Sequence, residues 1–310
     1  MLTVLQTALE VGLIYGLVAL ALFISFSILN IADLSTDGCF TLGCAVGAML
    51  TIAGHPILAL FAAMAAGMLS GYITAFLQTR LGVESILAGI ISNTGLYTIN
   101  LAVMVFSSNV TITGVDTVFS LFKGLVGGQW SRLILLALIA AVIVLVLIRF
   151  FGTSLGLSIR ATGDSLDMVS ASSINPKATI TIGLCLANAL TALSGCLIGE
   201  YNKFCDINLG TGMVTIALAS LIIGEVFAGR RGSVGKRVVC VVLGSIVYRF
   251  IIALALRLNI SAEYFKLVSA VIVAVAIAAP NMKDYVHLAK IKSNARKLRA
   301  LSGKGDETDA

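Results

Sequence analysis

The sequence predicts an all-α polytopic membrane protein with about nine transmembrane helices. Only 12% of its 310 residues are charged and 58% are hydrophobic, which leaves too little charge to cover the surface of a soluble domain. Several runs of about 18 or more residues lack charges almost entirely, and this length crosses roughly 30 Å of hydrocarbon as a helix. The runs are too long, and alternate too little, to be strands of a membrane barrel.

The apolar runs give the elements in chain order. We expect spans near residues 6–29, 38–54, 57–79, 84–106, 130–150, 178–200, 211–228, 236–257 and 262–281. The first run lacks the basic start of a secretory signal and is followed by further spans, so we interpret it as a retained helix. The run 38–54 is short and rich in glycine, which allows a broken or re-entrant helix. Residues 1–281 then form a transmembrane domain and residues 282–310 a basic tail.

The basic residues predict the orientation of the chain. Seven lysines and arginines follow Pro280, and such a tail is typical of the cytoplasmic side, where it can also contact anionic lipid. With the tail inside, nine spans place the N-terminus outside, and 15 basic residues fall in inside segments against five in outside segments. We therefore expect a multi-pass protein of the bacterial cytoplasmic (inner) membrane. The same distribution argues against nucleic acid as a partner.

The two halves of the chain resemble each other. Residues 31–38 (IADLSTDG) follow the first span, and residues 204–212 (FCDINLGTG) follow the sixth. At this offset of about 173 residues, spans one to four align with spans six to nine, and the aligned spans cross the membrane in opposite directions. Inverted repeats of this kind are common in transporters. Asp33 and Asp206 hold equivalent places, and each is expected to cap the helix that follows.

A polar segment, residues 156–176, separates two of the apolar runs. Its small residues would let a short helix enter a groove on a partner, and its charges would fix the orientation of that helix. Pro176 disfavours helix at the preceding residue, so the segment ends before the next span begins. An ordinary solvated loop is the alternative, although connections between neighbouring membrane helices are usually shorter. The residues expected to contact a partner are Arg160, Ala161, Gly163, Asp164, Ala171, Ile174 and Asn175.

The stretch GLSIRATGDSLDMVSASSIN (156–175) closely resembles the coupling segment of ABC-importer permeases, in the branch that carries branched-chain amino acids, simple sugars and nucleosides. The stretch from Gly12 (GLIYGLVALALFISFSILNIADLSTDG) resembles the same branch, as does SGCLIGEYNKFCDINLG followed by TIALASLIIGE. The resemblance covers about residues 5–280. More narrowly, LGVESILAGI together with LYTINLAVMVF resembles permeases associated with tryptophan or tyrosine uptake.

This resemblance implies a type II-like, inverted-repeat permease bundle that works by alternating access. It also implies two partners: an ABC ATPase subunit that holds ATP and Mg, and an extracytoplasmic substrate-binding protein that delivers solute to outer loops including 107–129 and 201–210. Such channels form between two permease subunits, so a homodimer is the simplest assembly and a heterodimer the alternative. The implied solute is a small polar molecule. An amino acid, including an aromatic one, comes first, with nucleosides and simple sugars still open.

The chain itself is expected to be neither an enzyme nor a cofactor-binding protein. Its best phosphate-loop candidate is residues 232–237, which contain Gly235-Lys236. The glycine that the motif needs five positions before Gly235 is Arg230, and the hydroxyl residue that must hold Mg²⁺ is replaced by Arg237. The six cysteines show no metal-ligand spacing, and most lie in apolar runs as small hydrophobes. ATP hydrolysis would therefore take place on a separate subunit, and no metal site is expected.

Polar side chains in the fourth span are candidates for a substrate path. Asn93, Tyr97 and Asn100 follow the spacing i, i+4, i+7 and would share one helix face. Two amides and a phenol could line a path without the cost of a charge. The alternative is hydrogen bonding between helices, which only holds the bundle together.

Two functions of other classes remain open. An ion-coupled secondary transporter would share inverted repeats but needs a carboxylate in the middle of the membrane or a broken-helix ion site, for which the one candidate is around 38–54. Glu10 and Glu200 lie near the expected outer ends of spans, where they can meet water, and Glu225 is expected to pair with Arg230 and Arg231. A membrane scaffold anchored through the basic tail would explain the tail but not the coupling segment.

Overall fold

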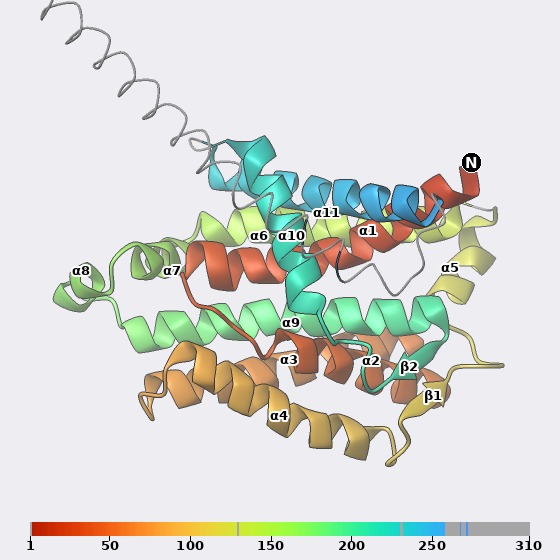
Figure 1. Cartoon of the computed structure of the whole chain (residues 1–310), viewed down its shortest axis with the longest axis horizontal. Coiled ribbons are helices and arrows are strands. Elements are labelled where there is room, and N and C mark those ends of the chain that lie inside the picture. Colours follow the sequence, from red (N-terminus) through yellow and green to blue (C-terminus); the bar gives the residue numbers. More distant parts are fainter. Residues whose placement is uncertain (1, 129, 230–231, 258–266, 268–270, 272–310) are drawn as a thin grey trace, which may run out of the picture.

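A computed structural model describes residues 2–128, 130–229 and 232–257, together with residues 267 and 271. This part of the chain is almost entirely helical (Figure 1). The helices are α1 Leu2–Leu22, continued by the π-helical η1 Phe23–Ile28, then α2 Thr36–Ile52, α3 Pro56–Thr79, α4 Ser85–Val103, α5 Val118–Val126, α6 Ser131–Phe151, α7 Ser154–Asp164, α8 Leu166–Ala171, α9 Pro176–Asn202, α10 Met213–Ala228 and α11 Val234–Arg257. Two short strands, β1 Asn109–Thr111 and β2 Phe204–Asp206, pair antiparallel.

The apolar helices confirm an all-α polytopic membrane protein. Six of the described helices are long and apolar enough to cross a membrane: α1 with η1, α3, α4, α6, α9 and α11. Helices α2 and α10 are apolar but shorter. These eight coincide with the first eight expected spans. The ninth, 262–281, lies outside the described residues apart from 267 and 271, and so does the tail 282–310.

The break expected in the second span lies before it rather than inside it. Helix α2 is continuous, and a non-helical stretch, residues 29–35, separates it from η1. At the start of this stretch the hydrogen bonding is π-helical rather than α-helical. The Leu29 N–H donates to the carbonyl of Ile24, five residues earlier, at 3.0 Å. Asn30 then adopts a left-handed backbone conformation with φ 55°. The first span therefore ends in a π-turn and an abrupt change of direction.

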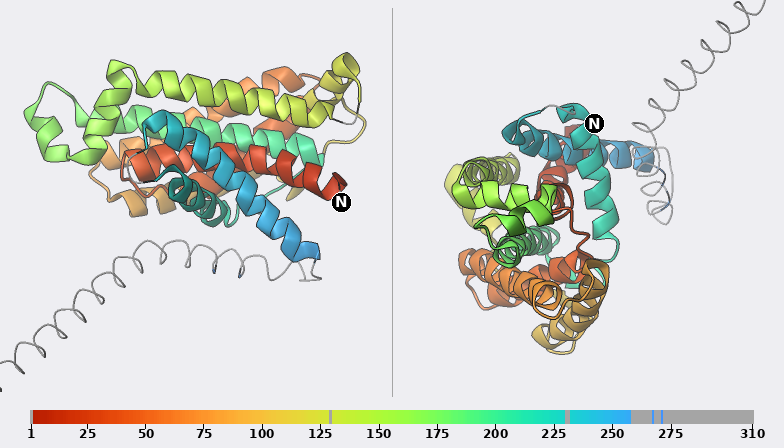
Figure 2. Two further views of the ribbon diagram at one scale, coloured as in Figure 1. Left: turned by 90° about the horizontal axis from the view of Figure 1, so that it is seen from above. Right: turned by 90° about the vertical axis from the view of Figure 1, so that its left-hand side faces the viewer.

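Helices α1 and α9 form the centre of the bundle. In the most apolar window of α9, 83% of the residues are buried, against 22% in α6, whose outer face is left for lipid. Helix α9 packs on α2 and α3, whereas α1 packs on α10 and α11. Helix α1, the first of the N-terminal half, thus packs among helices of the C-terminal half, and α9, the first of the C-terminal half, packs among helices of the N-terminal half. Helices α1 and α9 run in opposite directions (Figures 1 and 2). This exchange supports the predicted inverted repeat.

Glycines allow the closest of these helix contacts. A Cβ added to Gly67 would collide with the carbonyl oxygen of Asn188 on α9, and one added to Gly71 would lie 2.5 Å from the carbonyl oxygen of Leu184. Small residues bring helix backbones together in membranes, where dispersion contacts and hydrogen bonds drive association. These two glycines therefore allow α3 to pack directly against the backbone of α9.

Candidate functional site: the coupling helices and the polar junctions of the bundle

The polar segment 156–176 folds into two short helices at one end of the bundle (left in Figure 1). The Thr153 side chain accepts the N–H of Gly156 at 3.3 Å at the start of α7, and the Ser165 side chain accepts the N–H of Met168 at 3.3 Å at the start of α8. Each helix thus has its own hydroxyl cap, a preferred chemistry at this position. The segment is therefore two short capped helices rather than an irregular loop.

One face of α7 anchors the element to the bundle. Ile159 and Thr162 are buried, and the hydroxyl of Thr162 lies 2.8 Å from that of Thr179 on α9. Gly163 lies directly against the end of the first span, since an added Cβ would collide with the carbonyl oxygen of Ile28. Helix α7 therefore contacts η1 backbone to backbone, and a displacement of α7 would act on Ile28.

The predicted partner-contact residues divide between the outer surface and the chain itself. Asp164 and Ala171 are exposed, as is Asn175, whose side chain accepts the N–H of Lys177 at 3.0 Å and so caps α9. Arg160, Ala161 and Ile174 are half-buried. Gly163 packs against this chain's own first span.

Sequence reasoning missed the apolar side chains of this element. Leu157, Leu166 and Met168 are 52%, 53% and 67% exposed, on helices that project from the bundle. Exposed apolar side chains together on a projecting element are typical of a contact surface for another protein. The available signal was the presence of large apolar residues within an otherwise polar segment.

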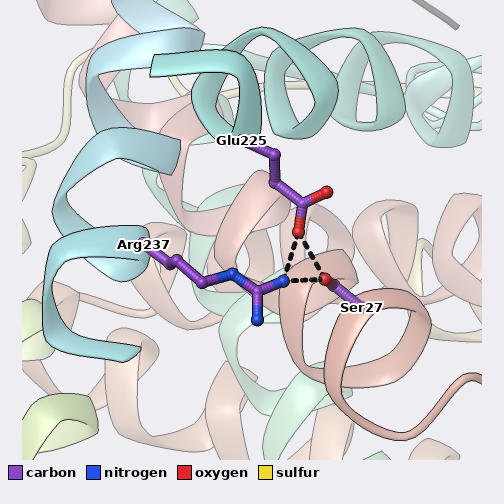
Figure 3. A network of polar contacts seen from close by, with 3 residues as sticks. All are labelled: Ser27, Glu225 and Arg237. Atoms are coloured by element: carbon purple, nitrogen blue, oxygen red, sulfur yellow. Dashed lines mark hydrogen bonds and ion pairs between the residues drawn. The ribbon is translucent and has the colours of Figure 1, made fainter. Parts of the chain in front are cut away.

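A polar network joins the end of the first span to α10 and α11 (Figure 3). Arg237 Nη2 lies 2.6 Å from Glu225 Oε1 and donates to Ser27 Oγ at 2.6 Å, while the Ser27 hydroxyl donates to the same Glu225 oxygen. The Arg237 guanidinium also lies over the ring of Phe23, 5.1 Å from its centroid. Three helices are therefore held at one point.

Among the described residues, this network gives Glu225 its basic partner. Its partner is Arg237, twelve residues later on α11, whereas Arg230 and Arg231 lie outside the described residues. Ser27 is adjacent to Ile28, so the α7 contact and the ion-pair network act on neighbouring residues of η1.

The three substrate-path candidates differ in their burial and in their contacts. The Asn100 side chain is buried and donates to the carbonyl of Gly38 on α2 at 3.0 Å. Asn93 also faces Gly38, since a Cβ added there would lie 2.5 Å from the Asn93 amide oxygen. Tyr97 is 52% exposed. Asn100 thus makes a hydrogen bond between helices, of the kind the alternative allowed, and Tyr97 is open to a partner or to lipid.

A second polar junction lies where the two halves meet. Asp33 is buried, and its carboxylate accepts from the amide of Asn188 on α9 at 2.8 Å. It also accepts from the backbone N–H of Ser35 at 2.9 Å and from its hydroxyl at 2.6 Å. Asn188 was missed by sequence reasoning, although an amide in the middle of an apolar span was the signal.

The capping role expected for the paired aspartates is wrong. Asp33 and Asp206 each accept the backbone N–H two residues later, from Ser35 and Asn208, which forms a turn rather than a helix cap. The shared geometry is further support for the repeat. The start of α10 is capped by Asp37 of α2, which accepts backbone N–H groups from Gly212 and Val214, both at 2.9 Å.

The loops 107–129 and 201–210 are joined to each other. Strand β1 in loop 107–129 pairs with β2 in loop 201–210, in the register Val110 opposite Cys205. Glu200 is buried rather than water-exposed, because its carboxylate accepts from the Thr51 hydroxyl at 3.0 Å and from the Val118 N–H at 2.8 Å. Glu10 is likewise buried and accepts from the Tyr201 hydroxyl at 2.9 Å. The expectation that these two carboxylates meet water is therefore wrong.

Residues 4–277 match the family described as branched-chain amino acid transport system / permease component. The chain belongs to this permease family. It is 30% identical to the tyrosine transport system permease protein of Clostridioides difficile (strain R20291), over 94% of this chain and 95% of that protein. It is also 31% identical to an uncharacterised protein of Rickettsia prowazekii (strain Madrid E), over 91% and 99% respectively. No solved structure gives a significant match to the permease.

These comparisons confirm the family resemblance drawn from the sequence. The similarity to a tyrosine transport permease also agrees with the narrower resemblance. The helical bundle and the exchanged first helices of the permease are consistent with this membership.

Proposed function

We propose that the chain is the transmembrane permease subunit of an ATP-driven ABC importer, which moves an amino acid across the bacterial inner membrane by alternating access. The observation that carries the proposal is the backbone contact between Gly163 on α7 and Ile28 at the end of the first span. It links a projecting two-helix element directly to the centre of the bundle. Membership of the permease family supports the same function.

The coupling route runs from α7 inward. An ABC ATPase subunit, holding ATP and Mg, binds the exposed side of α7 and α8 around Asp164 and Met168. Its closure displaces α7 and therefore Ile28. Because Ser27 belongs to the network with Glu225 and Arg237, the displacement reaches α10 and α11. The same η1 segment continues into residues 29–35 and so reaches Asp33, which is bonded to Asn188 on α9.

The orientation follows from the charges at this end of the bundle. The described ends of helices here carry Arg80, Arg149, Arg160, Lys177 and Arg237. A concentration of basic residues is typical of the cytoplasmic side. The paired loops 107–129 and 201–210 then lie outside, where an extracytoplasmic substrate-binding protein docks. Two copies of the chain form the channel as a homodimer, with a heterodimer as the alternative.

An aromatic amino acid is the first candidate solute. The support is the similarity to a tyrosine transport system permease over nearly the whole length of both chains. Nucleosides and simple sugars are the other solutes to be tested.

One observation favours a second function, an ion-coupled secondary transporter. Asp33 is a buried carboxylate at the junction of the two halves, and among the described residues it forms no ion pair. A carboxylate in such a place is a common feature of ion-coupled transporters. Its bonds to Ser35 and Asn188 give it a structural role that does not need an ion.

The test is ATP hydrolysis in vesicles that contain the permease, the ATPase encoded beside it and the accompanying binding protein. Tryptophan, tyrosine, leucine, adenosine and ribose are screened as the solute. Stimulation by a loaded binding protein supports the importer and names the solute. If hydrolysis ignores the permease and a proton or sodium gradient drives uptake instead, the ABC function is wrong.

A further inference from the structure

A cavity of about 330 Å³ opens between the last turn of α3 and the first turn of α9. These two helix ends lie at the same end of the bundle as α7 and α8 (Figure 1). Two basic side chains, Arg80 and Lys177, line it together with the hydroxyl residues Thr79 and Thr181. The cavity shares Asn175 with the segment 156–176, but neither the Gly163–Ile28 contact nor Asp33 lines it.

The cavity carries an excess of positive charge. Arg80 and Lys177 are exposed, and within the described part of the chain neither forms an ion pair. Glu84, the acidic residue closest to Arg80 in sequence, is not among the lining residues. The N-terminal end of α9 carries a partial positive charge and the C-terminal end of α3 a partial negative charge, and these two oppose each other. The full charges of Arg80 and Lys177 therefore decide the sign of the potential in the cavity. The site therefore favours an anionic group.

The wall of the cavity on the membrane side is aromatic and apolar. Tyr72 and Phe76 line it, with ring centroids 6.4 Å apart, and are 52% and 43% exposed. Along the same helix, Leu69 and Ile73 are 66% and 49% exposed and continue the apolar surface toward the middle of α3. Aromatic rings at the end of a spanning helix are typical of the headgroup level of a membrane. Cations, aromatic rings and an apolar face thus follow one another along α3.

We propose that this cavity binds an anionic phospholipid. The headgroup phosphate lies between Arg80 and Lys177, within reach of the hydroxyls of Thr79 and Thr181. The acyl chains lie along Tyr72, Phe76 and the exposed face of α3. A free phosphate ion would use the cations but has no use for the apolar wall, whereas a phospholipid matches both. Basic pockets between membrane helices bind anionic headgroups by this chemistry. The proposal requires that the chain spans a membrane but does not depend on ATP-driven import.

The test is native mass spectrometry of the full-length chain in detergent, with phosphatidylglycerol or phosphatidylcholine of the same acyl chains added. The pocket variant is Arg80→Gln with Lys177→Gln. The matched control, Arg149→Gln with Lys236→Gln, removes two other exposed cations near the same end and leaves the basic tail in place. Size-exclusion profiles and melting in neutral detergent check that both variants fold.

We expect the native chain to retain phosphatidylglycerol over phosphatidylcholine. The pocket variant should bind phosphatidylglycerol about 30-fold more weakly, because each basic side chain near an anionic lipid contributes about 1 kcal/mol. The control should change by less than about threefold. Retention without preference between the lipids, or equal losses in the pocket variant and the control, would overturn the proposal.

Two further experiments distinguish a bound phospholipid from a free phosphate ion and from a second copy of the chain. Tyr72→Ala with Phe76→Ala should weaken retention of the lipid, and millimolar inorganic phosphate should not displace it. If inorganic phosphate does displace the lipid, and if Tyr72→Ala with Phe76→Ala leaves retention unchanged, the ligand is a free anion and the lipid proposal is wrong. If the pocket variant keeps the lipid but loses self-association, the face is a contact between two copies of the chain.

Discussion

Gly163 on α7 lies so close to the carbonyl oxygen of Ile28 that no side chain fits between them. One of these residues belongs to the projecting two-helix element and the other to the π-helical end of the first span. Single π-turns inside membrane and soluble helices are frequent at functional sites. The contact therefore joins the surface that a partner can reach to the segment where the first span changes direction.

Gly163→Ala should destabilise the permease. The added methyl group must displace either α7 or the Ile28 carbonyl, and overpacking of this kind costs typically about 1–3 kcal/mol. Thermal unfolding in detergent measures the change. The control is Gly95→Ala on α4, where an added Cβ meets no atom within 4 Å. Equal melting temperatures for the two variants would show that the contact is loose.

Met168→Asp should weaken binding of the ATPase without unfolding the permease. Met168 is 67% exposed on α8, so the change removes an apolar contact and costs little in the isolated chain. Loss of a central contact residue typically costs about 2 kcal/mol or more, roughly 30-fold in affinity. Co-purification with the ATPase measures it. Leu121→Asp, on α5 at the opposite end, is the control and should leave binding unchanged.

Glu225→Gln and Arg237→Gln should be non-additive. The ion pair is partly exposed, with 29% and 35% of the two side chains accessible, so its net contribution is about 1 kcal/mol or less. Ser27 bonds to both partners, however, and either single change breaks the shared geometry. A double-mutant cycle by thermal unfolding should give a coupling energy of about 0.5 kcal/mol or more. Simple additivity would mean that the three helices are held independently at this point.

Asn188→Ala should be more harmful than Asp33→Asn. The first change leaves the buried Asp33 carboxylate without its amide donor, which costs about 1–3 kcal/mol and more for a charged group. The second removes the charge and keeps a carbonyl oxygen for the Ser35 bonds. Unfolding measurements and ATP-driven uptake compare the two. Uptake that survives Asn188→Ala but is lost in Asp33→Asn would favour ion coupling through Asp33.

The sequence predicted the helices better than it predicted their polar contacts. Hydropathy locates a span because each apolar residue contributes independently, so α3 and α9 begin and end within a few residues of the expected places. The contact of Glu225 with Arg237, twelve residues later, depends on how α10 and α11 pack against each other, which hydropathy does not give.

The candidate residues were limited by the same difficulty. Helical spacing placed Asn93, Tyr97 and Asn100 within about a sixth of a turn around the helix axis. It could not show that α2 covers Asn100 and leaves Tyr97 exposed, because that depends on the position of the neighbouring helix. Gly163 was chosen as a small residue for a partner's groove, but the chain uses it to approach its own first span.

The most direct test of the coupling contact is solute uptake per ATP hydrolysed in vesicles that hold the complete transporter. Native permease is compared with Gly163→Ala and with the Gly95→Ala control, each inserted to the same level. We expect Gly163→Ala to keep ATP hydrolysis while uptake per ATP falls about tenfold, and the control to match the native protein. Unchanged uptake per ATP in Gly163→Ala, despite a measured shift in its stability, would contradict transmission through the α7 contact with the first span.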